Sequence, residues 1–211
     1  MPELRYYYLS LEGESELLYF KRLEALIHAA PERRYEAVLD CVVNHSPGRS
    51  FKRLRQKALS HGETIPEIWH IRDMEERDNP AFYRALRELK QTGMRLCYSN
   101  YTFELWLLLH RCRMAEALSD KRNYLKYINR LFGTYYGTLH EYKEKQNQQK
   151  LLDRITLEDV RTAVVNAESI MHEKEQRQQA LEFCGFRYYP ENPATTVQVF
   201  VRQLLTDCGL I

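Results

Sequence analysis

The chain has 211 residues, of which 44% are hydrophobic and 28% are charged, and its formal net charge at pH 7 is only +2. This composition is ordinary for a globular protein, and no apolar run reaches the roughly 18 residues of a membrane span. A net charge this small does not by itself indicate a nucleic-acid partner, so only local clusters of basic residues can do so. The start of the chain lacks the layout of a signal peptide, and the five cysteines are scattered, which predicts reduced thiols in a cytoplasmic protein.

The first hundred residues alternate strand-like and helix-like patterns, which is typical of parallel βαβ units. Helices are expected between the strands, because apolar residues recur there at helical spacing and Asn79-Pro80 and Gly93 are typical helix boundaries. The pattern predicts an α/β fold with an open, mainly parallel four-stranded sheet flanked by helices. The expected strands are residues 4–11, 35–43, 67–72 and 94–98.

From Ser99 onward the pattern is helical almost throughout. Residues 141–150 are polar enough for a solvated helix or for a mobile connector, and the sequence leaves both open. We therefore expect an α/β core in residues 1–113 and a helical region in residues 114–211 that packs on it. The helices expected in the second half are residues 102–113, 121–132, 157–184 and 196–208.

Acidic residues stand where two of the predicted strands end. Glu12 follows the first strand and precedes Gly13, while Asp73 and Glu75 follow the third. Because ligands collect beyond the carboxyl ends of strands in open α/β sheets, these acids are candidate ligands for Mg²⁺ or Mn²⁺, which prefer oxygen. Residues two apart in a strand share a face, so Asp73 and Glu75 are expected to point to one ion. The alternative is that Glu12 caps the following helix and the others form a solvated acidic loop.

The apolar run from Phe103 to His110 indicates a buried helix, so its acid and its imidazole need partners. Glu104 is expected at the same edge of the sheet as Glu12 and Asp73, because this segment follows the fourth strand. The alternative for both residues is a favourable interaction with the helix dipole, Glu104 at its first turn and His110 at its last.

A basic amphipathic helix is expected after the second strand, with a positive face that suits phosphate binding. Its alternative is an ordinary solvated helix face. The candidate nucleic-acid-binding residues are Arg49, Lys52, Arg53 and Lys57.

Taken together and in order, several blocks of this sequence resemble the RloB-like (AbiLii-type) family. They span most of the chain: residues 12–16 with Tyr19-Phe20, the strand ending in Asp73, residues 99–110, and residues 192–196 (Asn-Pro-Ala-Thr-Thr). The resemblance implies a TOPRIM-type catalytic core, as in topoisomerases, primases and overcoming-lysogenization-defect nucleases, and a setting in prokaryotic phage defence or restriction. It also implies Glu12 as general base or metal ligand, Asp73 and Glu75 as metal ligands, and Glu104 as a supporting acid.

Two positions depart from the family pattern. The usual pair of aspartates separated by one residue is Asp73-Met74-Glu75 here, and Tyr101 stands where the family has proline. The leading hypothesis is a Mg²⁺-dependent nuclease that cleaves DNA or RNA in a defence system, with a partner ATPase or restriction protein. The alternative is a TOPRIM-like module with little or no catalytic activity that binds nucleic acid, a nucleotide or a protein. A purely structural helical adaptor would leave the acids at the strand ends unexplained.

Overall fold

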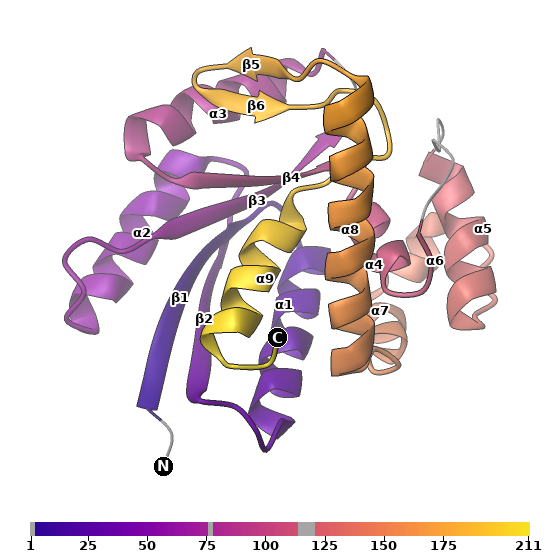
Figure 1. Cartoon of the computed structure of the whole chain (residues 1–211), viewed down its shortest axis with the longest axis horizontal. Helices are drawn as coiled ribbons and strands as arrows, with labels where there is room; N and C mark the ends of the chain where they lie inside the picture. Colours follow the sequence, from indigo (N-terminus) through magenta and orange to yellow (C-terminus); the bar gives the residue numbers. More distant parts are fainter. Residues whose placement is uncertain (1–2, 76–77, 114–120) are drawn as a thin grey trace.

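The computed structural model describes residues 3–75, 78–113 and 121–211, and a four-stranded sheet lies at its centre (Figure 1). The strands lie in the order β2-β1-β3-β4, and every neighbouring pair is parallel. The predicted α/β fold with an open parallel sheet flanked by helices is therefore confirmed. The strands are β1 (Glu3–Leu11), β2 (Tyr35–Val43), β3 (Ile68–Glu75) and β4 (Arg95–Asn100).

Alternate side chains of the strands enter two separate hydrophobic cores, one on each face of the sheet. Leu9 and Leu11 lie in the first core, whereas Tyr8 lies in the second. Helix α1 (Glu14–Ala29) packs into the first core, and helices α2 (Pro47–Ser60) and α3 (Pro80–Thr92) pack into the second. Each fully buried Leu, Ile or Phe stabilises this three-layer arrangement by about 1.5–3 kcal/mol relative to an exposed side chain.

The strand order reverses at β1, because β1 pairs with β2 on one side and with β3 on the other. Such a reversal leaves a crevice between the carboxyl ends of the two central strands, where helices leave the sheet toward opposite faces. Leu11 is aligned with Ile71 in the register of β1 and β3. Glu12 and Asp73 therefore arrive at this crevice from neighbouring strands.

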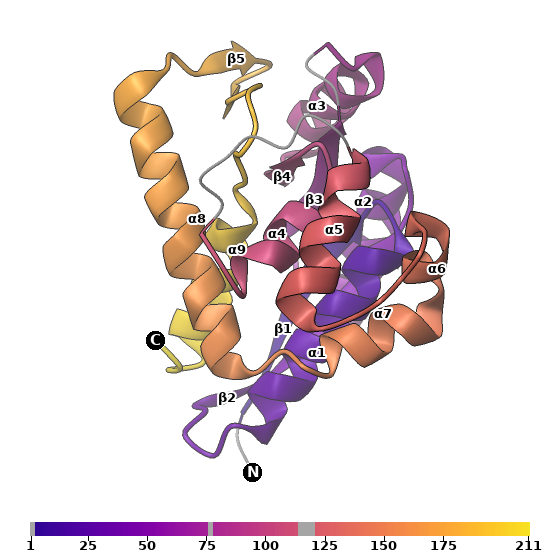
Figure 2. The same cartoon turned by 90° about the vertical axis from the view of Figure 1, so that its right-hand side faces the viewer.

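The remaining helices lie on the first face of the sheet, where they share a hydrophobic core with α1 (Figure 2). The expected helical C-terminal part is confirmed, and the polar region left open by the sequence contains two short helices. The predicted boundary between residues 113 and 114 falls at the start of a stretch outside the described residues, so it stays a prediction. The helices are α4 (Glu104–Leu109), α5 (Lys121–Phe132), α6 (Leu139–Lys143), α7 (Lys145–Leu152), α8 (Leu157–Arg177) and α9 (Val197–Asp207).

The long helix expected over residues 157–184 is shorter than predicted. Helix α8 ends at Arg177, and strands β5 (Leu181–Phe183) and β6 (Phe186–Tyr188) form an antiparallel hairpin above it (Figure 1). Cys184 and Gly185 have φ values of 56° and 85° at the tip. Two consecutive residues with positive φ are typical of a two-residue hairpin turn, so Gly185 ends a strand here and not a helix.

Smaller boundaries also differ from the sequence-based expectation. Gly13 is the N-cap of α1, although Ser15 is the residue there whose type usually caps a helix, and the Ser15 hydroxyl accepts a hydrogen bond from Gln148 at 2.7 Å. Helix α4 ends at Leu109, four residues earlier than expected. By contrast, Asn79 caps α3 as predicted.

Side chains and a C-terminal segment satisfy backbone groups on both edges of the sheet. On the β2 edge, the amide of Leu39 donates to Glu24 Oε1 at 2.7 Å and His28 Nε2 donates to the carbonyl of Ala37 at 2.6 Å. On the β4 edge, the amide of Asn100 donates to the carbonyl of Ala194 at 2.9 Å. These contacts protect edges that would otherwise present unpaired backbone groups to another strand.

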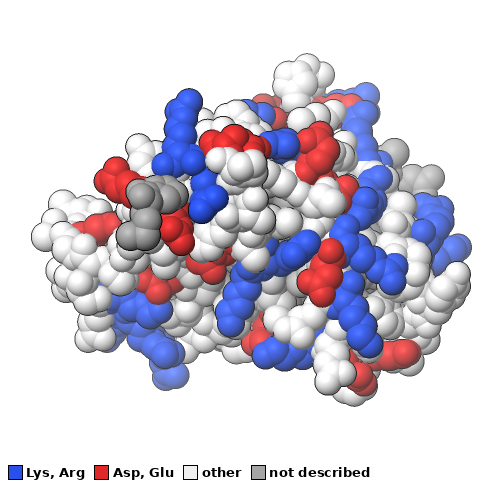
Figure 3. Space-filling model, turned by 90° about the horizontal axis from the view of Figure 1, so that it is seen from below, with Lys and Arg blue, Asp and Glu red and all other residues white. Residues whose placement is uncertain are grey.

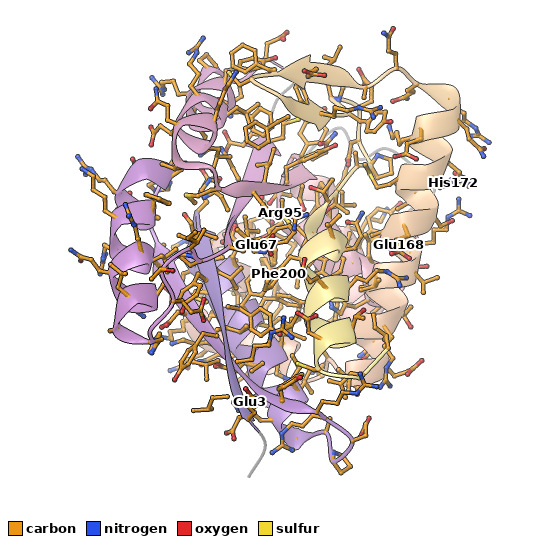
Figure 4. All side chains as sticks on the ribbon, turned by 60° about the vertical axis from the view of Figure 1, so that its left-hand side comes forward. Glu3, Glu67, Arg95, Glu168, His172 and Phe200 are labelled. Atoms are coloured by element: carbon orange, nitrogen blue, oxygen red, sulfur yellow. The ribbon has the colours of Figure 1, made fainter. Side chains whose placement is uncertain are left out.

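The amino ends of β3 and β4 are held by an ion pair. Figure 4 shows Glu67 and Arg95 close together beside Phe200 of α9, and Arg95 Nη1 lies 2.7 Å from Glu67 Oε1. On the face seen from below in Figure 3, basic and acidic side chains are interspersed. Within the described residues, no helix has the length and apolar character needed to cross a membrane.

Candidate functional site

A cavity of about 410 Å³ lies at the carboxyl ends of β1 and β3, and it is rich in carboxylates. We call it the acidic cavity. The structure brings together all four acids that the sequence singled out, Glu12, Asp73, Glu75 and Glu104, and adds residues that the sequence analysis missed. The lining residues used below are Glu12, Gly13, Glu14, Glu16, Asp73, Glu75, Glu104, Lys143 and Gln148.

Glu12 is held in place from the second face of the sheet. Its Oε1 oxygen lies 3.1 Å from Arg72 Nη2, and its Oε2 oxygen accepts a hydrogen bond from the backbone amide of Asp73 at 3.2 Å. The Arg72 side chain is only 6% exposed, so this ion pair is poorly screened by water. The arrangement differs from the helix-cap alternative, because the N-cap of α1 is Gly13 and no side-chain hydrogen bond caps it.

Asp73 and Glu75 both line the cavity, but their environments differ. Asp73 Oδ1 is shielded from solvent and accepts no hydrogen bond from any described residue. Burial, followed by the charges of the neighbouring Glu16, Glu104 and Glu12, raises the pKa of Asp73 well above its usual range. A bound cation would therefore stabilise the ionised form of this carboxyl.

Glu75 is exposed and lies beyond a shift of register between β3 and β4. Its φ of 56° is in the left-handed region, which non-glycine residues seldom adopt, and its Oε2 accepts a hydrogen bond from Asn79 Nδ2 at 2.9 Å. Strand alternation alone would give Asp73 and Glu75 the same orientation. The irregular end of β3 interrupts that alternation, so the expectation that both side chains point to one ion does not hold from strand geometry alone.

Glu104 lies in the first turn of α4 with 3% of its surface exposed. Its Oε2 oxygen accepts a hydrogen bond from Thr102, while its Oε1 accepts none from the described residues and lies 3.7 Å from Lys143 Nζ. His110 does not join the site. It bonds to Tyr19 and to the carbonyl of Trp106, at 3.1 and 3.0 Å, inside the hydrophobic core.

Glu16 is a further acid of the cavity that sequence reasoning missed. It is 4% exposed, and burial together with the charges of Glu104 and Glu12 raises its pKa from 4.5 to about 7. The available signal was its position four residues after Glu12, since that spacing places the two acids on one side of the helix start. Gly13 makes room for it, because a Cβ there would lie 3.0 Å from Glu16 Oε2.

Two polar residues of the cavity come from the region that the sequence left undecided. Lys143 ends α6 and is 54% exposed, and Gln148 lies buried on α7. Their contribution depends on how α7 packs against α1 and carries α6 with it, which is a tertiary contact that no local pattern encodes. Lys143 is the only lysine or arginine among the described residues that line the acidic cavity.

The basic residues predicted on α2 lie on its exposed side, so the amphipathic pattern is correct. Lys57 differs from Arg49, Lys52 and Arg53, because its Nζ forms a 2.5 Å ion pair with Asp40 Oδ1. Their contact with nucleic acid stays a prediction.

The donor set of the acidic cavity fits a hard divalent cation. Carboxylate oxygens are the ligands that Mg²⁺ and Mn²⁺ prefer, and two of those present, on Asp73 and Glu104, lack hydrogen-bond partners among the described residues. In that part of the chain, no three histidine, cysteine or acidic side chains are already grouped as metal ligands. A bound ion would have to draw the carboxylates together, and its charge would oppose the burial and the repulsion that raise the pKa of Asp73 and Glu16.

Comparisons with known proteins agree with the family resemblance seen in the sequence. The family model described as RloB-like protein matches residues 7–204. Searches of curated proteins and of solved structures find no match. The matched range begins within β1 and ends within α9, so it includes every strand end and helix that forms the acidic cavity. The chain belongs to the RloB-like protein family.

Proposed function

We propose that this protein hydrolyses phosphodiester bonds of DNA or RNA with Mg²⁺ or Mn²⁺ bound in the acidic cavity. The observation that carries the proposal is the cluster of Glu12, Glu16, Asp73 and Glu104 around one cavity at the reversal point of the sheet. Four acids in one partly buried site repel one another, and a divalent cation is the simplest partner that would stabilise them. The TOPRIM-type core implied by the family resemblance is part of this proposal.

The residues that would hold the ion are Asp73, Glu16 and Glu104, with Glu12 completing the set. A bound Mg²⁺ or Mn²⁺ neutralises charge on the phosphodiester and lowers the pKa of a ligated water. The ion pair with Arg72 fixes the orientation of Glu12, so this carboxylate needs little rearrangement to contact the ion or its bound water. The ammonium of Lys143 lies at the same cavity and is suited to stabilise negative charge on a non-bridging phosphate oxygen.

The test is cleavage by purified protein of supercoiled plasmid and of labelled RNA, with Mg²⁺, Mn²⁺ or EDTA. Asp73→Asn and Glu16→Gln should each lower metal-dependent cleavage by about a thousandfold, because several kcal/mol of charge stabilisation are lost with a ligand. The matched control is Glu175→Gln, which removes an exposed acid of α8. Cleavage that both cavity variants retain would contradict the proposal.

One observation favours a second candidate function. Glu75 replaces the aspartate of the family pattern, and its carboxylate is bonded to Asn79 at an irregular strand end. A cavity with one weakened ligand fits a module that binds nucleic acid, a nucleotide or a protein without cleaving it. Under this alternative, purified protein binds an oligonucleotide but does not cleave it with either metal, and Glu75→Asp restores cleavage.

The proposed setting is an effector of prokaryotic phage defence whose partner is an ATPase or a restriction protein. This part rests on the family resemblance alone. An adjacent gene for an ATPase or a restriction enzyme would support it, and co-purification of the two products would test the partnership directly.

A further inference from the structure

A second cavity, of about 310 Å³, lies on the opposite side of Glu12 from the acidic cavity. We call it the basic cavity. Glu12 and His45 line both cavities, so the two spaces are neighbours at the carboxyl end of the sheet. The residues that line the basic cavity and matter here are Glu12, His45, Ser46, Arg72, Arg84 and Glu88.

The alternation of β3 explains why the two cavities differ in charge. Asp73 points to the first face of the sheet, beside α1, whereas the preceding Arg72 lines the space beside α3 on the second face. Consecutive residues of one strand therefore supply an acid to one cavity and a cation to the other. Glu12 lies between them and contacts both residues.

Both acids of the basic cavity are already bonded to protein donors. Glu12 is paired with Arg72, and Glu88 Oε2 accepts hydrogen bonds from Ser46 Oγ at 2.8 Å and from the amide of Gly48 at 2.9 Å. The carboxylate of Glu88 therefore satisfies the first turn of α2, which would otherwise present unpaired donors. The charge of Glu12 is balanced by Arg72, whereas the donors to Glu88 are uncharged and leave its charge in place, so Arg84 must outweigh Glu88 when an anion binds.

The cationic groups are less completely satisfied. Arg72 is 5% exposed, and its Nε has no hydrogen-bond partner among the described residues. Arg84 is an exposed residue of α3 for which the described part of the chain offers no ion pair. A buried guanidinium with a free donor and a second guanidinium at the opening are the groups that bind phosphate oxygens.

We propose that the basic cavity binds a phosphate group of the substrate other than the one that is cleaved. The inference rests on the proposed function, because it places the scissile phosphate in the acidic cavity and a neighbouring phosphate across Glu12. The group is either an internal phosphate of the strand or the phosphate at its end, since both offer the same non-bridging oxygens. Bound there, it fixes the register of the strand relative to the acids.

The test measures binding of a fluorescent single-stranded oligonucleotide in EDTA, over a range of salt concentrations. Arg84→Ala should weaken binding about fivefold at 0.1 M salt and lower the salt slope by about 0.7, the effect of one lost phosphate contact. The matched control is Lys90→Ala, which removes an exposed cation from the same helix away from the cavity. Equal weakening by the two variants, or an unchanged salt slope, would overturn the proposal.

This measurement separates the pocket from the proposed function, because binding in EDTA needs no cleavage. If the wild type cleaves nucleic acid and Arg84→Ala binds it like Lys90→Ala, the pocket is wrong and the nuclease stands. If Arg84→Ala alone weakens binding and no cleavage is seen, the nuclease is wrong and the pocket stands. Where cleavage occurs, Arg84→Ala should raise KM about fivefold and leave kcat within twofold.

The source of the phosphate is settled by two short oligonucleotides that differ in their 5′ end. If the cavity takes the terminal phosphate, Arg84→Ala removes the preference for a 5′-phosphorylated strand over a 5′-hydroxyl strand. If it takes an internal phosphate, the variant weakens both strands by the same factor. Either result supports the pocket, whereas full wild-type affinity for both strands would contradict it.

Discussion

The acidic and basic cavities lie side by side at the end of one sheet but manage charge in opposite ways. In the basic cavity each carboxylate has a bonded partner within the protein, Arg72 for Glu12 and the first turn of α2 for Glu88. In the acidic cavity, Asp73 and Glu104 each keep an oxygen that accepts no hydrogen bond from the described residues. The comparison teaches that the same residue types either complete the fold or leave it in need of a ligand, depending on the face of the sheet they occupy.

The largest effect is expected on the pH dependence of stability in the absence of metal. The pKa of Glu16 is raised from 4.5 to about 7 in the folded protein, so the folded state binds more protons than the unfolded state between these pH values. The free energy of unfolding should therefore fall as pH rises from about 4.5 to about 7, by an amount on the order of 3 kcal/mol. Urea unfolding in EDTA at several pH values measures it.

Glu16→Gln should remove most of this slope and make the protein more stable than the wild type above pH 7. The control is Glu14→Gln, since Glu14 lines the same cavity but its side chain is 53% exposed. If the free energy of unfolding falls equally steeply with pH in the wild type and in Glu16→Gln, the pKa of Glu16 is not raised in the folded protein.

Metal binding should stabilise the protein through one cavity alone. At a Mg²⁺ or Mn²⁺ concentration of one hundred times Kd, linkage predicts a gain of about 2.7 kcal/mol, or a rise in Tm of about 5–10 °C for a protein of this size. Asp73→Asn should lose this gain, and Arg84→Ala should keep it. Thermal unfolding with metal and with EDTA measures the rise in Tm. If Asp73→Asn keeps this rise, the ion binds elsewhere.

Neutralising the two acids that meet at the wall between the cavities should change stability in opposite directions. Glu12→Gln leaves Arg72, which is 6% exposed, without a charged partner, so the free energy of unfolding should fall by about 1–3 kcal/mol. Asp73→Asn removes a carboxyl whose pKa is raised by burial and by three acidic neighbours, so stability at neutral and alkaline pH should rise by about 1 kcal/mol. Chemical unfolding in EDTA compares them, and changes of the same sign would refute the contrast.

The smallest effect is expected on α2, where one of four predicted phosphate-binding residues already has a partner. Because Lys57 is paired with Asp40, Lys57→Ala should cost at most about 1 kcal/mol of stability and should weaken oligonucleotide binding less than Arg53→Ala does. Fluorescence anisotropy on both variants measures the difference. Equal losses of affinity would mean that nucleic acid displaces Asp40 from Lys57.

Much of the framework follows from local patterns. The alternation of strand-like and helix-like segments predicts the four strands, and the acids after the first and third strands identify the edge where the acidic cavity forms. The position of Glu104 follows in the same way, because it comes directly after the fourth strand. These inferences succeed because the position and the ends of a strand are encoded by short stretches of sequence, whereas the order of the strands in the sheet is not.

Other features depend on contacts between distant segments. Lys143 and Gln148 reach the cavity because α7 packs against α1 and α6 packs against α7, and a polar stretch gives no sign of that. The Glu12–Arg72 ion pair is also a tertiary contact. Tyr101 illustrates a backbone effect: its φ of 55° is closed to proline, so the departure from the family pattern goes with a different local conformation.

The hydrogen bonds from α1 to the outer edge of β2 have a consequence for assembly. Glu24 and His28 occupy the amide of Leu39 and the carbonyl of Ala37, the groups with which an added strand would pair. A second copy that extended the sheet at this edge would have to displace both of these partly buried side chains, and the carboxylate and the imidazole would then need new partners. Two copies joined at this edge would form one continuous sheet of eight strands. We expect that this sheet does not form and that any self-association of this protein uses its helical surfaces.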